Sequence, residues 1–312
     1  AVAGITNATK DHTLVRKLSV TSPNNDWDES RGTDASDSEW IVYAKDTWTN
    51  IGYHGATWTG ASNTDWATAG NWDSGVPSNS NNVTVPDVEN APIIGATTGA
   101  VTNDLTITEP DGINITAGGS LIVSGTSSGN ITYTRNLATT NWYLVSSPVV
   151  GQTYNDAYVT ANGIASGTGS NRGIASYVTG DDSWDYMQAG ESLTFTPSSG
   201  YSVKRSTTGD ISFTGTMPVE DVSIAITNGY NLVGNPYPSY IAANTNADGA
   251  NNILTVNTSI LSEATLWMWN QSSSSYDTFN QASSSMDIAP AQGLFVKTSG
   301  SNTLSITEAM QS

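Results

Sequence analysis

The tightest group of side chains that could perform chemistry is a set of three carboxylates, Asp181, Asp182 and Asp185. A pair of carboxylates can cleave a glycosidic bond, and carboxylates with backbone oxygens can bind Ca²⁺. Two of the three lie at Gly180–Ser183, the tip of an expected hairpin, where Asp is favoured because its side chain bonds to the local backbone. We therefore expect a solvated turn. Weak Ca²⁺ binding is the alternative, and no other cofactor is expected.

The histidines and nucleophiles do not form a recognisable catalytic set. The chain has two histidines, His12 and His54, and no cysteine. A zinc site needs three or four nitrogen or sulfur ligands. A serine nucleophile needs a histidine beside it, and the Gly-x-Ser-x-Gly turn typical of many such enzymes is absent. We therefore predict that this chain is not an enzyme, with a catalytic domain upstream of Ala1 as the alternative.

Aromatic side chains are stronger candidates for binding, because a flat ring with a polar edge can stack on a sugar. Alternate residues of a strand share one face, so Trp267 and Trp269 lie together, opposite Met268. Large aromatic residues are commonly buried, and we expect core packing for most of those that recur in a duplicated segment: Trp142, Trp184, Tyr186, Trp267, Trp269 and Tyr276. The candidate binding residues are Trp58, Trp66, Trp72, Trp184, Tyr237 and Tyr240.

Charge and composition exclude several classes of partner. The 312 residues carry a formal net charge of −18. Such a field repels nucleic acid phosphate and anionic lipid, and no apolar run approaches the roughly 20 residues of a membrane span. We expect no nucleic acid partner and no membrane insertion. The absence of cysteine is compatible with export, and a chain that starts at Ala1 is expected to be a mature or proteolysed fragment.

The second half of the chain contains an internal duplication. The segment Asn141–Pro148 returns as Gly229–Pro236, and Gly200–Lys204 returns as Gly293–Lys297. A duplication of this length predicts two copies of one β-rich unit. The segments between the matching strands differ more, and one short helical turn is expected within residues 242–260.

The expected fold class is all-β, because Thr, Val, Ile and aromatic residues are abundant and strong helix formers are scarce. Short alternating segments such as Val83–Val85 and Leu105–Ile107 predict a ladder of strands, either a short β-solenoid or a meander. We expect four parts: a partial β-sandwich (1–54), a Trp-rich cap with the ladder (55–137), and two sandwich-like repeats (138–222 and 223–312).

The first segment resembles the C-terminal part of a lamin-tail domain. The resemblance lies in Asp11–Lys17, Asp26-Trp27, Ser38–Val42 and Ile51–His54. It implies part of an immunoglobulin-like β-sandwich, completed either by this chain or by another one.

From about residue 55 onwards the chain resembles the C-terminal repeat regions of secreted flavobacterial and other Bacteroidetes proteins of the type IX secretion class. The residues that carry this resemblance are Trp58–Pro77, Asn141–Pro148 with Gly151-Gln152, Tyr230–Ser239 and Ala291–Lys297. It implies an extracellular or outer cell-surface location and no particular activity.

These observations predict a non-catalytic, exported structural or adhesive protein of the cell surface. Its expected partners are other copies of itself, a surface protein or glycans. Unpaired strands at the start of the chain suggest self-association by strand addition into a filament. The alternative is an accessory region, binding substrate or glycan, of a secreted hydrolase such as an extracellular nuclease.

Overall fold

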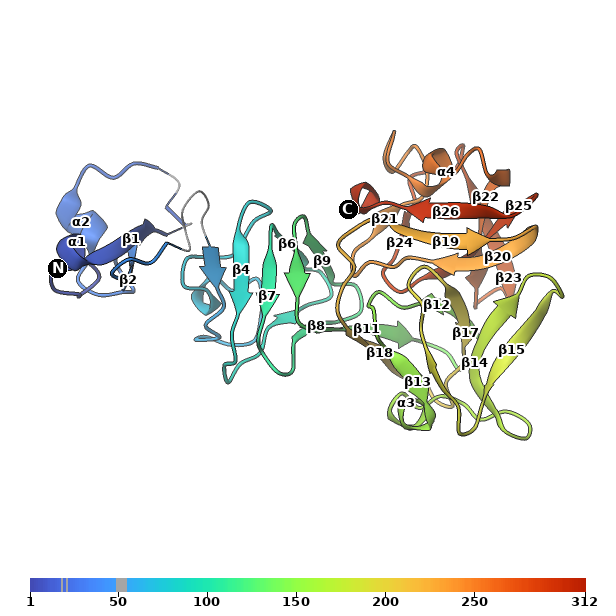
Figure 1. Cartoon of the computed structure of the whole chain (residues 1–312). Coiled ribbons are helices and arrows are strands. Elements are labelled where there is room, and N and C mark those ends of the chain that lie inside the picture. Colours follow the sequence, from blue (N-terminus) through green and yellow to red (C-terminus); the bar gives the residue numbers. More distant parts are fainter. Residues whose placement is uncertain (18, 21, 49–54) are drawn as a thin grey trace. The chain divides into compact units, whose positions relative to one another are not determined.

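The computed structural model describes the whole chain except residues 18, 21 and 49–54 (Figure 1). The described residues form many short strands and only short helices, so the predicted all-β fold class is confirmed. The chain divides into two compact units. The first contains residues 1–114 and 123–129, and the second contains residues 115–122 and 130–312.

The first unit begins with an antiparallel pair of strands, β1 (His12–Arg16) and β2 (Trp40–Ala44). Both lie where the sequence predicts strands. Two short helices accompany them, α1 (Ala8–Asp11) and α2 (Trp27–Arg31). The carboxylate of Asp26 caps α2 by accepting hydrogen bonds from its first backbone N–H groups.

In the described part of this segment no third strand joins β1 and β2. The sandwich implied by the lamin-tail resemblance is therefore represented here by two strands only. Its last quoted element, Ile51–His54, lies almost wholly among the residues that the structure does not describe.

The predicted ladder is a parallel β-solenoid. The strands β3 (Gly55–Thr57), β4 (Asn82–Val85), β7 (Leu105–Ile107) and β10 (Ser127–Ser128) pair side by side, and every pairing is parallel. A meander would pair antiparallel strands, so the solenoid alternative holds. Alternate side chains of β4 and β7 are buried, as the period of two predicts.

A cluster of three tryptophans closes one part of the first unit. Trp58, Trp66 and Trp72 are all buried, with ring centroids 4.7–6.4 Å apart. The indole nitrogen of Trp58 donates to the carbonyl oxygen of Asn90 at 2.7 Å, and that of Trp72 donates to the carbonyl oxygen of Trp66 at 2.8 Å. The cluster is thus a compact cap with satisfied polar atoms.

The second unit contains the two repeats, and their central sheets have the same strand order. The first sheet is, in order, β12 (Tyr143–Ser146), β17 (Gly200–Val203), β14 (Asn171–Val178) and β15 (Ser183–Gln188). The second is β20 (Gly229–Gly234), β25 (Gly293–Thr298), β22 (Leu261–Asn270) and β23 (Ser275–Asn280). Every neighbouring pair in both sheets is antiparallel.

Shorter strand pairs complete the repeats. They are β11 (Ile131–Leu137) with β18 (Gly209–Gly215), β13 (Thr153–Asn155) with β16 (Ser192–Thr194), β19 (Val222–Ile226) with β26 (Asn302–Ile306), and β21 (Ile241–Ala242) with β24 (Asp287–Ile288). The remaining elements of the chain are η1 (Ala69–Asn71), β5 (Ile93–Ile94), β6 (Gly99–Thr102), β8 (Ile113–Ile115), β9 (Ser120–Val123) and η2 (Glu308–Met310).

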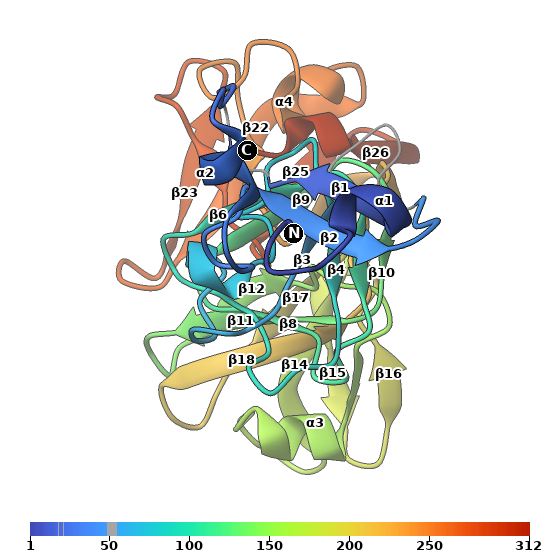
Figure 2. The same ribbon diagram turned by 90° about the vertical axis from the view of Figure 1, so that its left-hand side faces the viewer.

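Each repeat also contains one short helix, α3 (Asp156–Ala161) or α4 (Ile253–Val256). The side chain of Asn155 caps α3 and that of Asn252 caps α4 in the same way, so the duplication extends to these caps. The sequence predicts α4 within 242–260. It does not predict α3, because so short a helix shows no periodicity. The two helices lie at opposite ends of this unit in both views (Figures 1 and 2).

Candidate functional site

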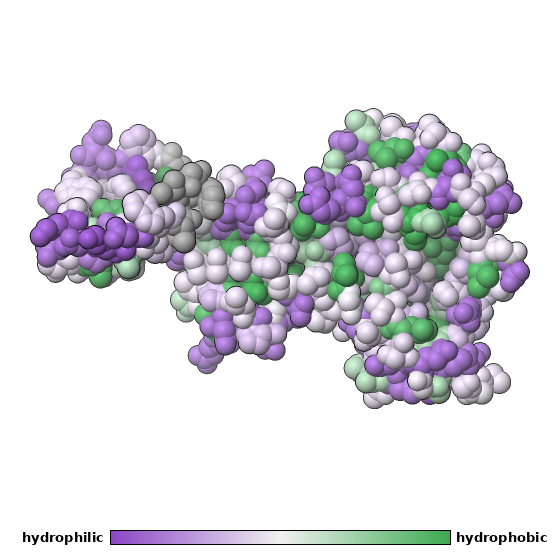
Figure 3. All heavy atoms as spheres, viewed as in Figure 1, coloured by the Kyte–Doolittle hydropathy of each residue, from purple (hydrophilic) through white to green (hydrophobic). Residues whose placement is uncertain are grey.

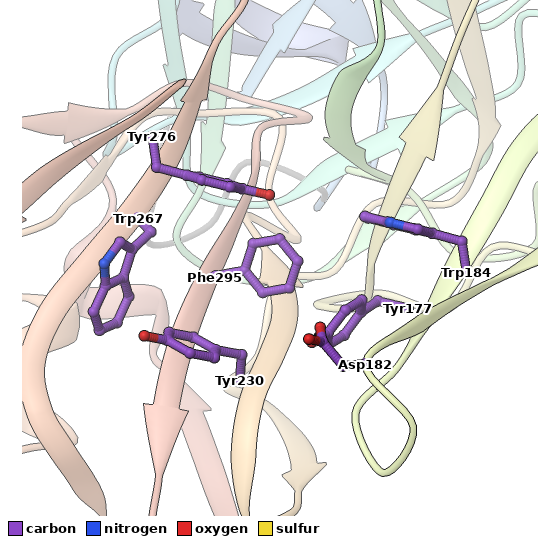
Figure 4. A pocket seen from close by; sticks show the side chains of 7 residues that line it. All are labelled: Tyr177, Asp182, Trp184, Tyr230, Trp267, Tyr276 and Phe295. Carbon is purple, nitrogen blue, oxygen red and sulfur yellow. The ribbon is translucent and has the colours of Figure 1, made fainter. Parts of the chain in front are cut away.

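The two repeats meet along a cleft walled by aromatic side chains (Figure 4). Its volume is about 420 Å³. Tyr177, Asp182 and Trp184 line it from the β14–β15 hairpin of the first repeat. The second repeat contributes one residue from each strand of its sheet: Tyr230, Trp267, Tyr276 and Phe295.

Strand alternation turns these aromatic rings toward the cleft. On β22, Leu266 is fully buried and Met268 packs with it into the core of the second repeat. Trp267 and Trp269 therefore lie on the opposite face, where both are only half-buried. The sheet of the second repeat thus has an aliphatic face toward its own core and an aromatic face toward the cleft.

The prediction that the duplicated aromatic residues form core is therefore wrong. Five of the six are half-buried, Trp142, Trp184, Tyr186, Trp267 and Trp269, and Tyr276 is exposed. The shared strand face of Trp267 and Trp269 was predicted, but that face meets a neighbouring repeat rather than a core.

Phe295 forms the floor of the cleft. It is 5% exposed and packs with Leu144 and Leu232 in a small cluster that joins the two repeats. The rings of Tyr177 and Tyr276 meet it edge-on, at centroid distances of 4.8 and 5.7 Å and interplanar angles of 86° and 81°. Such edge-to-face contacts hold the walls in a defined geometry.

Two walls of the cleft are open to solvent. Tyr276 is 43% exposed and Tyr230 is 39% exposed, although both side chains are large and largely apolar. The rest of the visible surface of this unit shows hydrophobic groups scattered among polar ones (Figure 3). Exposed large apolar side chains that adjoin one another in a hollow are typical of contact with a ligand or partner.

Polar groups at the rim complete the cleft. The hydroxyl of Tyr177 donates a hydrogen bond of 2.5 Å to a carboxylate oxygen of Asp182. Burial, followed by this hydrogen bond, raises the pKa of Tyr177 well above its usual value, and burial also raises the pKa of Tyr276. Both phenols therefore keep their protons at neutral pH, and Tyr177 uses its proton in the hydrogen bond to Asp182.

Two further hollows continue from the cleft. The first has a volume of about 200 Å³ and shares Trp184 and Tyr276 with the cleft. The second, of about 320 Å³, shares Trp142 and Tyr186 with the first. We call the cleft and these two hollows together the aromatic groove. Its further lining residues are Leu144, Ala165, Ser166, Gly167, Thr168, Asn171, Arg172, Gly173, Ser202, Lys204 and Trp269.

One donor in the groove lacks a partner. The indole nitrogen of Trp269 is buried and makes no hydrogen bond to any other described residue. A buried donor left unpaired costs about 1–3 kcal/mol. An acceptor on a bound molecule would remove this cost.

The tryptophans that the sequence suggested as binding residues in the first unit do not reach the surface. Trp58, Trp66 and Trp72 are 0%, 1% and 5% exposed, so none offers a free ring face. They stabilise the cap, because large aromatic side chains gain most from burial.

Of the other candidates, Trp184 lines the aromatic groove, whereas Tyr237 and Tyr240 do not. Tyr237 is fully buried, and its hydroxyl lies 2.9 Å from the carbonyl oxygens of Glu220 and Ile306. Tyr237 is thus a core residue rather than a binding residue. Tyr240 is half-buried.

The three aspartates Asp181, Asp182 and Asp185 are exposed. No group of three or more His, Cys, Asp or Glu side chains suited to a metal ion exists among the described residues. Asp182 instead contributes its carboxylate to the cleft.

Sequence reasoning missed most of the cleft as a site. It did not single out Tyr177, Tyr230 or Phe295, and it assigned Trp267 and Tyr276 to the core. The available signal was the recurrence of aromatic residues on one strand face in both copies. The sequence pattern does not reveal that the aromatic strand faces of the two repeats are turned toward each other.

No helix in the described ranges is long and apolar enough to cross a membrane. A family model described as a domain of unknown function (DUF8693) matches residues 57–127, which contain the tryptophan cap and the solenoid strands β4 and β7. No curated protein matches the chain. No solved structure matches it either.

Proposed function

We propose that this protein is a non-catalytic adhesive protein of the cell surface and that it binds carbohydrate in the aromatic groove. The observation that carries the proposal is the cleft itself, where six aromatic side chains and one carboxylate surround a hollow of about 420 Å³. The export and surface location rest on the sequence resemblance to secreted Bacteroidetes proteins.

Sugars suit this combination of surfaces. A sugar ring has apolar C–H faces and a rim of hydroxyl groups, so it needs flat apolar walls with donors and acceptors at their edges. The groove offers the rings of Trp267 and Tyr276 as walls, the Asp182 carboxylate as an acceptor and the free indole N–H of Trp269 as a donor.

Aromatic rings can also stack on nucleic acid bases. The net charge of −18 opposes that alternative, because phosphate contacts supply most of the affinity for a nucleic acid. The groove also lacks the pair of carboxylates used by most glycoside hydrolases. Asp182 is the only carboxylate among the described residues that line it. Binding without cleavage is therefore the function that these side chains support best.

A glycan array followed by titration calorimetry with the best neutral oligosaccharide tests the proposal. Trp267→Ala and Tyr276→Ala each remove one wall of the cleft, and we expect binding to weaken about tenfold or more. Trp48→Ala is the matched control, because Trp48 is 68% exposed and lies outside the groove. Silence across the array, or wild-type affinity in both groove variants, would contradict the proposal.

Self-association is a second candidate function, favoured by one observation. Each of β1 and β2 has only one strand neighbour among the described residues, so each leaves one edge without a strand partner there. Such edges can accept a strand from another copy. Light scattering and electron microscopy of the purified chain test this, and a monomer at all concentrations would exclude the filament.

A further inference from the structure

One lysine recurs at the equivalent position of both repeats, but it has a carboxylate partner in only one of them. Lys204 and Lys297 occupy the same position of the duplicated Gly-x-x-Val-Lys pattern, Lys204 just after β17 and Lys297 on β25. Both ammonium groups lie over an aromatic ring, Lys204 at 5.8 Å from the centroid of Trp142 and Lys297 at 5.0 Å from that of Tyr230.

In the second repeat the lysine has its own carboxylate. Glu263 stands opposite Lys297 in the β22–β25 register, and its carboxylate forms an ion pair with the Lys297 ammonium group. This pairing raises the pKa of Lys297, and the hydrogen bond that Lys297 donates to Glu263 is the largest cause. The positive charge at this site is therefore satisfied within the chain.

In the first repeat the equivalent carboxylate is missing. The residue opposite Lys204 is Gly173, whose carbonyl oxygen accepts a hydrogen bond of 2.8 Å from the Lys204 backbone nitrogen. A Cβ at Gly173 would lie only 2.6 Å from the carbonyl oxygen of Lys204 and 3.0 Å from that of Ala165, so no larger side chain fits there. Among the described residues no carboxylate lies within ion-pair distance of Lys204.

The space beside Lys204 is the outer hollow of the aromatic groove. It has a volume of about 320 Å³ and is also lined by Arg172, whose guanidinium is paired with Asp156 at 3.3 Å. The hollow therefore combines an unpaired ammonium group, a partly neutralised guanidinium and two aromatic rings.

We propose that the outer hollow binds an anionic group of the glycan, which takes at Lys204 the place that the Glu263 carboxylate takes at Lys297. This inference rests on the proposed carbohydrate binding and specifies its substrate class as acidic sugars. A carboxylate on a uronic acid and a sulfate ester share the required chemistry. The stacked rings would hold the sugar, and Lys204 would select the charged one.

The test compares an acidic oligosaccharide with its uncharged derivative. Oligogalacturonate and its methyl ester share the same sugar backbone, and the ester replaces each carboxylate with an uncharged group that is larger by one methyl. We expect the acid to bind about tenfold more tightly than the ester. We also expect this preference to fall with added salt, because salt screens exposed charges. A sulfated galactan oligosaccharide and its desulfated form provide the second pair, so that the pair showing the preference identifies the anionic group.

Lys204→Met removes the charge and keeps much of the apolar stem. We expect it to abolish the preference by weakening binding of the acid more than binding of the ester or the desulfated sugar. A circular dichroism spectrum like that of the wild type checks that the variant is folded. Lys204→Arg should retain most of the preference. Lys10→Met is the control, because Lys10 is exposed and belongs to the first compact unit, whereas the groove belongs to the second.

The two proposals fail differently. If neutral sugars bind in the groove but neither acidic member of a pair binds better, or if Lys204→Met keeps the preference, the anionic site is wrong and carbohydrate binding stands. If no charged or neutral sugar binds, the carbohydrate function and the anionic site are both wrong.

Discussion

The backbone nitrogen of Gly234 donates a hydrogen bond of 2.9 Å to the carbonyl oxygen of Ser198, which belongs to the other repeat. The equivalent residues make the reciprocal contact, from the nitrogen of Ser146 to the carbonyl oxygen of Ala291 at 3.0 Å. Ser198 and Ala291 both have positive φ angles, 62° and 58°. The two copies therefore bend alike and exchange equivalent contacts, as the halves of a symmetric interface do.

This close approach of the two repeats explains why β17 and β25 each begin with a glycine, Gly200 and Gly293. A Cβ at Gly293 would lie 2.8 Å from the carbonyl oxygen and 2.9 Å from the nitrogen of Val145, and one at Gly200 would lie 2.7 Å from the carbonyl oxygen of Val233. We expect Gly293→Ala to destabilise the second unit by about 1–3 kcal/mol, because the crossing strands would have to separate. Urea unfolding followed by tryptophan fluorescence measures the change.

The control for Gly293→Ala is Gly249→Ala. No atom lies within 4 Å of a Cβ placed at Gly249, and its φ is not in the left-handed region, so we expect a change within about 0.5 kcal/mol. Equal stability of the two variants would show that the repeats do not cross as tightly as the structure has them.

Local sequence patterns predicted the strands well. The alternation of Val83–Val85 and Leu105–Ile107 placed β4 and β7, and the duplicated segments placed the strands of both repeat sheets. These elements follow from local period and from turn residues, which act over a few positions. The parallel pairing of the ladder was one of two alternatives, because spacing alone does not reveal strand direction.

Local sequence patterns could not predict the aromatic groove. The pattern of β22 correctly groups Trp267 with Trp269, but period two cannot tell which face of a strand meets its core. The answer depends on Leu266, which fills the second repeat's own core, and on the docking of the first repeat. A contact between segments so distant in sequence leaves no local signature.

Tyr237 shows the opposite error, because the sequence suggested it as a candidate binding residue. Its fully buried hydroxyl contacts two carbonyl oxygens instead. We expect Tyr237→Phe to lower the free energy of unfolding by about 1–3 kcal/mol, because buried acceptors lose a donor. Carbohydrate binding should not change. Thermal unfolding and calorimetry check the two statements, and weaker binding at unchanged stability would restore Tyr237 as a binding residue.

The lowered pKa of Glu39 predicts how the stability of the β1–β2 pair changes at acidic pH. Its carboxylate accepts hydrogen bonds from Asn24, Ser30 and Arg16 at 2.9, 2.7 and 2.8 Å, and these bonds lower its pKa from 4.5 to about 2, with Asn24 as the largest cause. The ionised form is therefore favoured in the folded state. Its stabilising contribution is complete above pH 4.5 and is lost as the pH falls toward about 2.

The indole N–H of Trp40 reports on this region, because it donates to Ser30, one of the partners of Glu39. We expect its NMR resonance in the folded wild type to shift around pH 2, where Glu39 takes up its proton. Glu39→Gln cannot ionise and should remove this transition. An identical transition in the variant would mean that another group controls the acid response.

Tyr177 links the apolar and polar parts of the cleft, because its ring packs on Phe295 and its hydroxyl bonds to Asp182. Tyr177→Phe removes only the hydroxyl, and we expect neutral sugar to bind about threefold to tenfold less tightly. Tyr177→Ala also removes the wall and should weaken binding further.

Since burial and Asp182 raise the pKa of Tyr177, wild-type binding should stay constant up to about pH 10, near the ordinary pKa of tyrosine. Calorimetry across this range measures both effects, and wild-type affinity in the Ala variant would place the sugar elsewhere.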